Sequence, residues 1–551
     1  MAQWKKDDLL FVPLGGSNEI GMNANLYHYK GKWLMIDLGA GFADTYYPGV
    51  QMLAPDLRFL YERKEDFLGV VLTHAHEDHV GSVGYLWDKL ECPIYATPFT
   101  ASMARSKLQE RGWLDKAKII EKKPGSSFDI GPFSLEMLQI THSIPEMNGI
   151  VLRTEHGTVF HTGDWKFDPN PVIGTASDFD KLKKIGDEGV LAMVCDSTNV
   201  FTEKHSGSEG DLFESLSGLI AKQQELVIVT TFASNVARMH TIAKAAEAND
   251  RKVVLAGWSL HRISTFAKEA GYLEDISPFI SDTEMKSYKR DKLLVMCTGC
   301  QGESNAAMNK IAEGNHPFVR LRPRDTVIFS SKIIPGNEKS LFRLFNKFVR
   351  LGVEVLTEKD HFVHVSGHPS REELTKMYDL VRPKVAVPVH GEPVQLHEHV
   401  KLAKSIGIEQ QVEIENGQLV RLAPGEVKTL EHVHTGYLAV DGRLLQPRDG
   451  DVMKMRRRLQ NDGIIVVTLV LNMGGGLALE PSILAAGVID ATSKAGRQFI
   501  RYVTDELVDI LDDQGNTSND RMSKTARNTV RRLFKEETGK RPPVEIQIAR
   551  V

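Results

Sequence analysis

The chain is poor in cysteine for its length, with four cysteines in 551 residues. So few thiols exclude the disulfide framework that staples small secreted domains. Cys297 and Cys300 form a C-x-x-C pair, but no second pair exists to complete a four-thiolate zinc site. Their glycine-rich surroundings indicate a tight turn instead.

Long apolar runs are also absent. No segment approaches the roughly 20 apolar residues that span a bilayer, and the N-terminal residues lack the order of a secretion signal. We therefore expect a cytoplasmic protein with no membrane partner. The net charge of −4 excludes a strong overall attraction to nucleic acid. A local basic groove and bound cations can nevertheless attract a polyanion.

Local patterning divides the chain into segments of different character. Residues 1–204 alternate short β-rich runs with turns, and the same pattern resumes over 356–450. Between them, residues 205–355 alternate apolar strands with helices, which is typical of a parallel sheet covered on both faces. This pattern predicts an α/β domain inserted into the first. The polar, basic run 451–460 is interpreted as a linker, and 461–551 as a small α+β domain.

The densest group of metal-ligand residue types is His-Ala-His-Glu-Asp-His at 74–79, directly after an apolar run. Alternate residues of a strand share one face, so His74, His76 and Asp78 are expected to point the same way. Imidazole suits Zn²⁺, and a carboxylate among histidines is typical of hydrolytic zinc sites. Dividing these ligands and His79 between two ions would relieve the crowding. The alternative is a solvated loop, but such a cluster has no packing purpose.

Further ligand candidates follow other expected strands. They are His142, Asp164 and His390. One histidine of this kind is usually a satisfied turn residue, and His390 alone leaves a metal ligand and a capped strand end equally open. Together with the cluster at 74–79, the three positions predict one assembled metal centre.

These motifs resemble the series found in hydrolases of the metallo-β-lactamase fold. The inserted domain, Asp196-Ser-Thr-Asn199 and His364-Val-Ser-Gly-His368 are similar to the β-CASP branch, which processes nucleic acids. Within that branch, the run 15–21, Pro335-Gly-Asn-Glu338 and the C-terminal domain resemble the bacterial ribonuclease J family. The resemblance covers essentially the whole chain.

The resemblance implies an α/β fold class with three domains. A metallo-β-lactamase αββα sandwich would be formed by 1–204 and 356–450. The β-CASP α/β domain would be inserted at 205–355, and a small C-terminal α+β domain would occupy 461–551.

The same resemblance implies two Zn²⁺ ions per subunit, with Mn²⁺ or Mg²⁺ as substitutes. The expected ligands are His74, His76 and His142 for one ion, Asp78, His79 and His390 for the other, and Asp164 as the bridge. Asp37 and Asp196 would lie behind the ligands and orient them. Two such ions activate a water and stabilise charge on a phosphodiester under attack.

The segment 364–368 is implied to bind substrate, since a glycine permits close backbone approach and Ser and His add donors. Its residues are His364, Val365, Ser366, Gly367 and His368. We expect His368 to contact the scissile phosphate and to protonate the leaving oxygen. Asp78, His368 and His390 are therefore the residues assigned to catalysis. The alternative is a β-turn with incidental histidines.

Ser234, Asn235 and Arg238 form a second candidate phosphate site at an expected helix start, where the helix N-terminus and Arg attract anions. In the ribonuclease J family, a pocket for a 5′-monophosphate supports stepwise 5′→3′ degradation. The alternative is a plain N-cap with a surface arginine. The basic run 454–458 is either a solvated linker or an RNA contact.

Two positions depart from the family pattern. Trp258 stands where an arginine is expected, which puts a phosphate or structural contact there in doubt. Residues 46–51 contain no acid, so the structural Ca²⁺ site of some relatives is predicted to be absent.

As a whole, the sequence predicts a zinc-dependent ribonuclease of RNA maturation and decay, both an endonuclease and a 5′→3′ exonuclease on 5′-monophosphorylated RNA. A thioester or lactone hydrolase of the same fold would not need the inserted domain or 364–368. An inactive scaffold of RNA degradation would be expected to have lost ligands. The expected partners are single-stranded RNA, further copies in a homodimer or homotetramer formed through the C-terminal domain, and an RNA-degradation complex.

Overall fold

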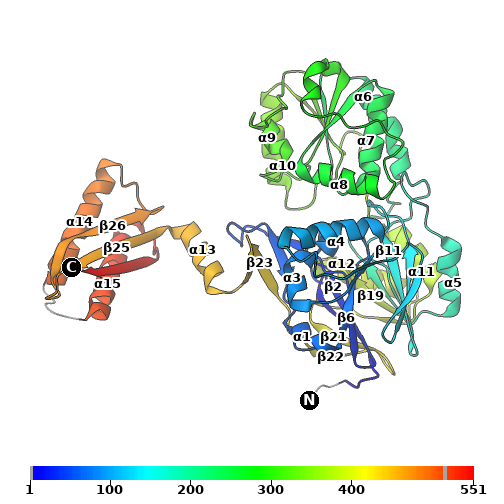
Figure 1. The fold of residues 1–551 in the computed structure, drawn as a ribbon, viewed down its shortest axis with the longest axis horizontal. Helices are drawn as coiled ribbons and strands as arrows, with labels where there is room; N and C mark the ends of the chain where they lie inside the picture. The colour runs from blue at the N-terminus through cyan, green and yellow to red at the C-terminus, as the bar shows by residue number, and fades with distance from the viewer. Residues whose placement is uncertain (1–3, 513–517) are drawn as a thin grey trace. The chain divides into compact units, whose positions relative to one another are not determined.

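The computed structural model describes residues 4–512 and 518–551, which fall into two compact units (Figure 1). The first unit comprises Met1–Gly41 and Ala54–Gly436, and the second comprises Phe42–Leu53 and Tyr437–Val551.

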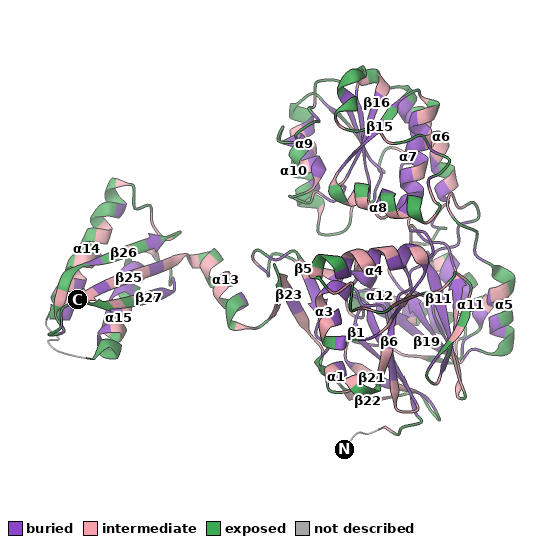
Figure 2. Ribbon diagram, in the orientation of Figure 1, coloured by how far each residue is buried: buried purple, intermediate pink, exposed green. Residues whose placement is uncertain are grey.

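Two facing sheets form the centre of the first unit. One has the strand order β22 (Lys428–His432), β21 (Gln418–Ala423), β1 (Leu9–Gly15), β2 (Ala24–Tyr29), β3 (Lys32–Ile36), β6 (Phe67–Val71), β7 (Ile94–Ala96) and β8 (Ile119–Glu121). The other has the order β20 (Gln410–Gln411), β19 (Val385–Val389), β13 (Ala192–Asp196), β12 (Gly157–His161), β11 (Asn148–Thr154), β10 (Phe133–Gln139) and β9 (Ser127–Ile130). One core of buried residues, including Phe11, Leu135 and Val194, joins both sheets. Figure 2 shows buried residues concentrated along these strands.

A two-residue turn at Lys30 and Gly31 joins β2 to β3, with Tyr29 paired to Lys32. Both turn residues have positive φ, 50° and 74°, which matches the twist that tight hairpins prefer.

Helices cover the outer faces of the sandwich. The helices α5 (Phe179–Glu188), α11 (Arg371–Val381) and α12 (Pro393–Ser405) pack on the seven-stranded sheet through residues such as Leu182, Leu374 and Leu402. The eight-stranded sheet is accompanied by α1 (Arg58–Tyr61), α2 (Glu77–Val80), α3 (Val83–Leu90) and α4 (Pro98–Arg111). The predicted αββα sandwich is confirmed.

The inserted domain contains a five-stranded sheet whose neighbouring strands are all parallel. Its order is β15 (Lys252–Ala256), β16 (Leu293–Cys297), β14 (Val227–Thr230), β17 (Thr326–Phe329) and β18 (Glu354–Leu356). Its helices are α6 (Leu212–Ala221), α7 (Val236–Ala248), α8 (Trp258–Glu269), α9 (Ala307–Ala312) and α10 (Glu338–Arg350). Short 3-10 helices in this part of the chain are η2 (Glu209–Asp211), η3 (Glu284–Ser287) and η4 (Arg290–Lys292), and another, η1 (Lys64–Asp66), precedes β6 in the sandwich. The predicted parallel sheet is confirmed, and the burial of every residue of β14, β16 and β17 accounts for its apolar strands.

The second unit contains two smaller sheets. One has the order β24 (Leu444–Pro447), β23 (Tyr437–Asp441), β5 (Met52–Pro55) and β4 (Gly41–Phe42); the other has the order β26 (Leu477–Ala486), β25 (Ile464–Leu471) and β27 (Val544–Arg550). Helices α14 (Lys494–Asp512) and α15 (Asn519–Thr538) share a core with the three-stranded sheet.

The expected linker 451–460 lies inside helix α13 (Asp451–Asp462). The division between the units falls at Gly436, ahead of the expected position near 450, because the hairpin β23–β24 pairs with β5 in the second unit's sheet. None of the helices in the described part of the chain is long and apolar enough to span a membrane.

Candidate active site

The seven predicted metal ligands converge at one edge of the sandwich. They follow β6, β10, β12 and β19, and the neighbours β12, β13 and β19 run parallel, so their carboxyl ends meet there. The side chains form two overlapping groups in which all ligand atoms lie within 4.8 Å of one another. These groups are His74, His76, His142 and Asp164, and Asp78, His79, Asp164 and His390.

The first group consists of three imidazoles and one carboxylate. His76 Nδ1 lies 3.0 Å from His74 Nε2 and 3.1 Å from His142 Nε2. Asp164 Oδ2 lies 3.8 Å from His74 Nε2 and 3.9 Å from His142 Nε2. The four atoms therefore surround one small volume.

The second group shares Asp164 with the first. His79 Nε2 lies 3.1 Å from Asp164 Oδ2 and 3.6 Å from Asp78 Oδ2. His390, which is 312 positions from Asp78 in the chain, places Nε2 3.1 Å from Asp78 Oδ2. The fold thus gathers the side chains of the sequence cluster and the late histidine.

Outer hydrogen bonds hold the imidazoles with one nitrogen turned inward. Asp37 accepts from His79 Nδ1 at 2.7 Å and also from the backbone and hydroxyl of Thr73. His142 Nδ1 donates to the carbonyl of Gly367 at 2.5 Å, and His390 Nδ1 lies 2.8 Å from Thr198 Oγ1. With the outer nitrogen of each ring as the hydrogen-bond donor, the inner nitrogen is the one that can offer a lone pair to a cation.

The resulting centre is a cluster of acceptors. The inner nitrogens of His79 and His390 face carboxylate oxygens of Asp164 and Asp78, so each contact needs positive charge between its atoms, either a proton or a cation. Imidazole nitrogens with one or two carboxylates are the donor set of hydrolytic metal sites. The residues present therefore fit divalent metal binding, and Asp164 belongs to both groups.

The histidine pKa values differ between the first and the second ligand group. Burial lowers the pKa of His74 and His142 well below the ordinary value and that of His76 to about 4, so these rings are neutral. Burial also opposes the charged form of His79, but Asp164, Asp78 and Asp37 raise its pKa well above the ordinary value. The second group therefore attracts positive charge strongly, whether a proton or a cation.

Two turns at the centre, those of Asp37 and of the predicted ligand His390, adopt a backbone conformation that non-glycine residues rarely populate. Asp37 has a φ of 63° and His390 has a φ of 55°. Each is held by its neighbours: His390 N donates to the carbonyl of Gly16, and Asp37 N donates to that of Val71. Such strain, on the order of 1–3 kcal/mol per residue, typically persists where surrounding contacts enforce it at functional sites.

His368 lies beside the centre and is bonded to Asp196. Its Nδ1 is 2.8 Å from Asp196 Oδ2, while Asp196 Oδ1 accepts from the backbone and hydroxyl of Thr198. With Asp164 and His390, these two residues form a third group with ligand-type atoms in mutual reach. Burial opposes the charged form of His368, but the Asp196 carboxylate raises the pKa of His368 above its ordinary value.

The sequence interpretation missed the residues that hold the 364–368 segment. Asn199 Nδ2 donates to Ser366 Oγ at 2.6 Å and to the carbonyl of His368 at 3.2 Å. Thr198 and Asn199 belong to the Asp196–Asn199 motif noted in the sequence. The motif alone did not indicate which residues they contact. Gly367 is required for close approach, since a Cβ there would lie 2.9 Å from His142 Cε1.

One member of the predicted substrate segment, Val365, needs correction, and a second, His364, stays a prediction. The side chain of Val365 is buried and faces Gly207, where a Cβ would lie 2.7 Å from Val365 Cγ1, so it fills space between chain segments. His364 is half-buried, and its Nδ1 has no hydrogen-bond partner among the described residues. Ser366, Gly367 and His368 are the members that the structure brings beside the predicted ligands.

The predicted phosphate site at 234–238 also needs correction. Arg238 is fully buried, and its guanidinium is bonded to Glu209, Ser330 and the carbonyl of Val363. Asn235 is a buried N-cap that accepts from Arg238 N at 2.8 Å. With its donors committed inside the protein, Arg238 does not offer them to an RNA phosphate; Ser234 is half-buried beside it.

Trp258, the departure from the family pattern, is 67% exposed at the start of α8. Arg262 stacks over its ring at 4.3 Å and binds Glu110 of α4 at 2.6 Å. The same guanidinium lies 3.8 Å from Glu77, the residue between two predicted ligands. The inserted domain is thus tied to the ligand-bearing loop through this arginine.

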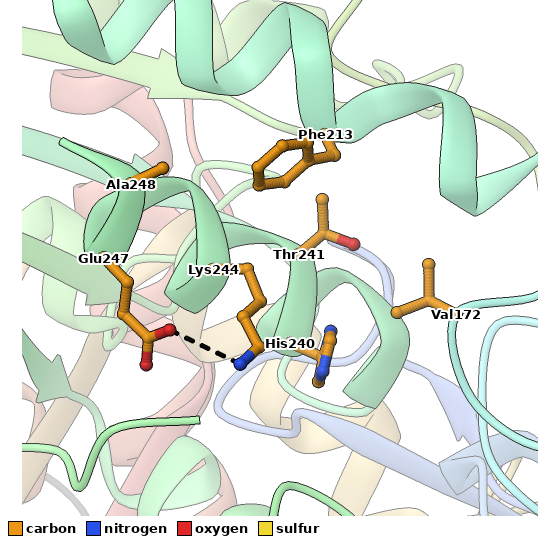
Figure 3. Close-up of a pocket in the computed structure, with 7 residues that line it drawn as sticks. All are labelled: Val172, Phe213, His240, Thr241, Lys244, Glu247 and Ala248. Atoms are coloured by element: carbon orange, nitrogen blue, oxygen red, sulfur yellow. Dashed lines mark ion pairs between the residues drawn. The ribbon is translucent and has the colours of Figure 1, made fainter. Parts of the chain in front are cut away.

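A separate shallow depression lies against α7 (Figure 3). Its lining residues are Val172, Phe213, His240, Thr241, Lys244, Glu247 and Ala248. None of the predicted site residues contributes to it, so the acceptor cluster at the strand ends remains the candidate centre.

Comparison with known proteins gives four family matches along the chain. They are the metallo-beta-lactamase superfamily at 20–191, the ribonuclease J beta-CASP domain at 224–348, the Zn-dependent metallo-hydrolase RNA specificity domain at 352–414 and the ribonuclease J C-terminal domain at 451–551. A ribonuclease J from Sinorhizobium meliloti is 38% identical over 99% of this chain and 98% of its own length. The chain belongs to the ribonuclease J family.

Other members of the ribonuclease J family are similar over most of the chain. Ribonuclease J from Thermus thermophilus is 34% identical over 84% of this chain and 82% of its own. Ribonuclease J 1 from Streptococcus pyogenes is 34% identical, over 88% and 87% respectively. A solved protein of unknown function from Enterococcus faecalis has a TM-score of 0.52 at 18% identity, covers 75% of this chain and 99% of its own, and shows the fold alone.

Proposed function

We propose that this chain is a metal-dependent ribonuclease that hydrolyses phosphodiester bonds of single-stranded RNA. The observation that carries the proposal is the convergence of seven ligand side chains, with His368 beside them, at the edge of a sandwich that carries the β-CASP insertion. The family membership agrees with this chemistry.

Two Zn²⁺ ions are the proposed cofactors, with Mn²⁺ or Mg²⁺ as substitutes. His74, His76 and His142 hold one, Asp78, His79 and His390 hold the other, and Asp164 bridges them. When bound, such a pair of ions supplies an activated water and neutralises charge on the phosphodiester oxygens. The imidazole-rich first group favours zinc, whereas the two carboxylates of the second suit harder cations as well.

The protein side chains position and protonate the reacting groups. Asp37 holds His79, and Asp196 holds His368, so neither ring rotates away from the substrate. Because His368 Nδ1 is bonded to Asp196, its Nε2 is the nitrogen that contacts the scissile phosphate and protonates the leaving oxygen. Ser366 and Gly367 place hydroxyl and backbone donors beside His368, where they can bind the phosphate oxygens.

The proposed activity has two modes, internal cleavage and stepwise 5′→3′ removal of nucleotides from 5′-monophosphorylated RNA. Both modes serve RNA maturation and decay, including rRNA processing and mRNA decay, in the cytoplasm and within an RNA-degradation complex. The support is the similarity to ribonuclease J proteins over nearly the whole chain.

Self-association through the C-terminal domain, as a homodimer or homotetramer, is part of the proposal. In β25, Ile465, Val467, Leu469 and Leu471 belong to the core shared with α14 and α15. The residues between them are half-buried and lie on the other face, where Val470 pairs with Leu479 and Val466 pairs with Leu484. Leu479 and Leu484 are 64% and 61% exposed, so this apolar face is suited to cover by a second copy.

The test uses RNA with a labelled 5′-monophosphate end. The wild-type protein is expected to release mononucleotides and internal fragments, and to stop when a chelator removes its metal. A His76→Ala variant is expected to lose both activities. Release that continues in chelator, or in His76→Ala at the wild-type rate, would reject the metal-dependent nuclease.

A thioester or lactone hydrolase on the same fold is the rival enzyme. Such a reaction has no use for the ordered segment that Asn199 holds beside the centre or for the domain inserted between the ligand segments. An inactive scaffold would not require that all seven ligand side chains converge.

A further inference from the structure

A buried ion pair lies where the chain enters the inserted domain. Arg238, on α7, binds Glu209 through two parallel bonds, Nε to Oε2 at 3.0 Å and Nη2 to Oε1 at 2.9 Å. The two side chains are 0% and 2% exposed. Glu209 belongs to the segment by which the chain leaves the sandwich, so the pair joins that segment to the inserted domain.

The remaining donors of Arg238 reach the segment by which the chain returns. Its Nη1 donates to the carbonyl of Ser330 at 3.0 Å, to Ser330 Oγ at 2.8 Å and to the carbonyl of Val363 at 3.2 Å. Ser330 Oγ donates to the same Val363 carbonyl at 2.7 Å. Val363 directly precedes the 364–368 segment, so Arg238 fixes the point where that segment begins.

On its other side, Glu209 is connected to the loops that carry metal ligands. Its backbone N donates to Asp168 Oδ2 at 2.9 Å, and Lys166 Nζ lies 3.1 Å from the same oxygen. Asp168 N donates to Thr141 Oγ1, which donates to the carbonyl of Lys166. All of these side chains are buried.

The buried network therefore reaches three functional positions, two loops with predicted metal ligands and the start of the 364–368 segment. Thr141 directly precedes His142, and Lys166 follows Asp164 by two residues, while Val363 leads into 364–368. A buried ion pair adds little net stability over an apolar pair of the same volume, but it is geometrically demanding. An arginine that commits its fork to three chain segments can set their relative position.

We propose that Arg238 is a positioning residue for the nuclease reaction, holding the 364–368 segment in register with the loops of His142 and Asp164. In that register, the Gly367 carbonyl meets His142 and the His368 ring meets Asp196. The inference rests on the proposed function. A misplacement of about 1 Å at the reacting groups is enough to lower turnover about a hundredfold.

The test compares Arg238→Lys with Arg251→Lys in the full-length, metal-loaded protein. Arg251 is a matched control, since it is also buried in the inserted domain, and among the described residues its guanidinium bonds to carbonyls of that domain, those of Gln223, Glu225 and Leu293. Arg238→Lys is expected to lower single-turnover kcat about a hundredfold. RNA affinity, measured by fluorescence anisotropy, and metal content are expected to stay within about threefold, and Arg251→Lys is expected to keep kcat.

Hydrogen exchange gives a second readout that does not depend on activity. In Arg238→Lys, the amides of 364–368 are expected to exchange about tenfold faster or more, as follows from losing a charge-assisted hydrogen bond. The strand 385–389 is expected to keep its protection. If the wild-type protein does not cleave RNA, the proposed function fails, while the exchange comparison still tests the role of Arg238 in holding the segment.

Ser330→Ala provides a variant that removes one hydroxyl and no charge. It is expected to accelerate hydrogen exchange at the amides of 364–368 and to lower kcat by about threefold to tenfold. This range corresponds to the net contribution of one hydrogen bond. The inference is overturned if Arg238→Lys keeps wild-type kcat and exchange, or if its losses only match those of Arg251→Lys. Should Arg238→Lys not fold, unchanged kcat and exchange in Ser330→Ala would overturn it.

Discussion

The two units of this protein differ in composition as sharply as in structure. All 19 histidines, all four cysteines and all six tryptophans lie in the first unit, and the second unit has none of them. The first unit places polar side chains at strand ends, where they converge. The second alternates apolar residues along β25 and packs them against α14 and α15, and its described residues contribute no side chain to the ligand cluster. The comparison separates a unit organised around chemistry from one organised around packing.

The largest effect is expected at the carboxylate shared by both metal groups. Asp164→Asn keeps the size of the side chain but removes the negative charge that both groups need. We expect the rate of RNA cleavage to fall by more than about a hundredfold, which exceeds the effect of losing a hydrogen-bond partner of a metal ligand. Single-turnover cleavage measures it, with Asp275→Asn as the control because Asp275 is an exposed acid outside the centre. Cleavage by Asp164→Asn at the rate of the control would contradict the shared site.

The next effect concerns the outer bond to His79. Asp37→Asn keeps a carbonyl acceptor but loses the charge that orients the ring, so metal affinity is expected to fall by about 10–100-fold. Competition with a chromophoric chelator measures the affinity. Unchanged affinity would show that Asp37 serves the fold alone.

Sequence reasoning found the ligand candidates because they follow strands with an apolar pattern, but their division between two ions came from the family resemblance. It placed His390 with Asp78 only through family resemblance, since no local pattern encodes a contact across 312 positions. Arg238 was misjudged for the same reason. A helix start with Asn and Arg indicates an anion site locally, but Glu209, Ser330 and Val363, which occupy its guanidinium, come from distant segments.

A smaller effect is expected in the pH dependence of stability, and it should distinguish the two units. Burial lowers the pKa of His399 to about 4, where the ring contacts Ser197 and Tyr378. The unfolded chain binds this proton near pH 6.5, so the stability that the neutral ring contributes is present above that pH. It is lost as the pH falls toward 4, by as much as about 3 kcal/mol.

Urea unfolding followed by tryptophan fluorescence measures this, because every tryptophan lies in the first unit. His399→Gln is expected to flatten the decline between pH 6.5 and 4. The second unit, which has no histidine, is expected to show no decline from this source. An unchanged slope in His399→Gln would refute the assignment.

The smallest effect on stability is expected on the outer face of the second unit. Leu484→Ser changes an exposed residue, so the free energy of unfolding should stay within about 0.5 kcal/mol. Sedimentation is expected to show weaker self-association, and a chain truncated near residue 455 should lose it. Particle mass unchanged in both variants would reject association through this domain.

Anomalous diffraction at the zinc edge, from crystals of the zinc-loaded protein, tests the central claim most directly. Two peaks are predicted, one among His74, His76 and His142 and one among Asp78, His79 and His390, with Asp164 in contact with both. A single peak, or a second peak that His390 does not contact, would contradict the account.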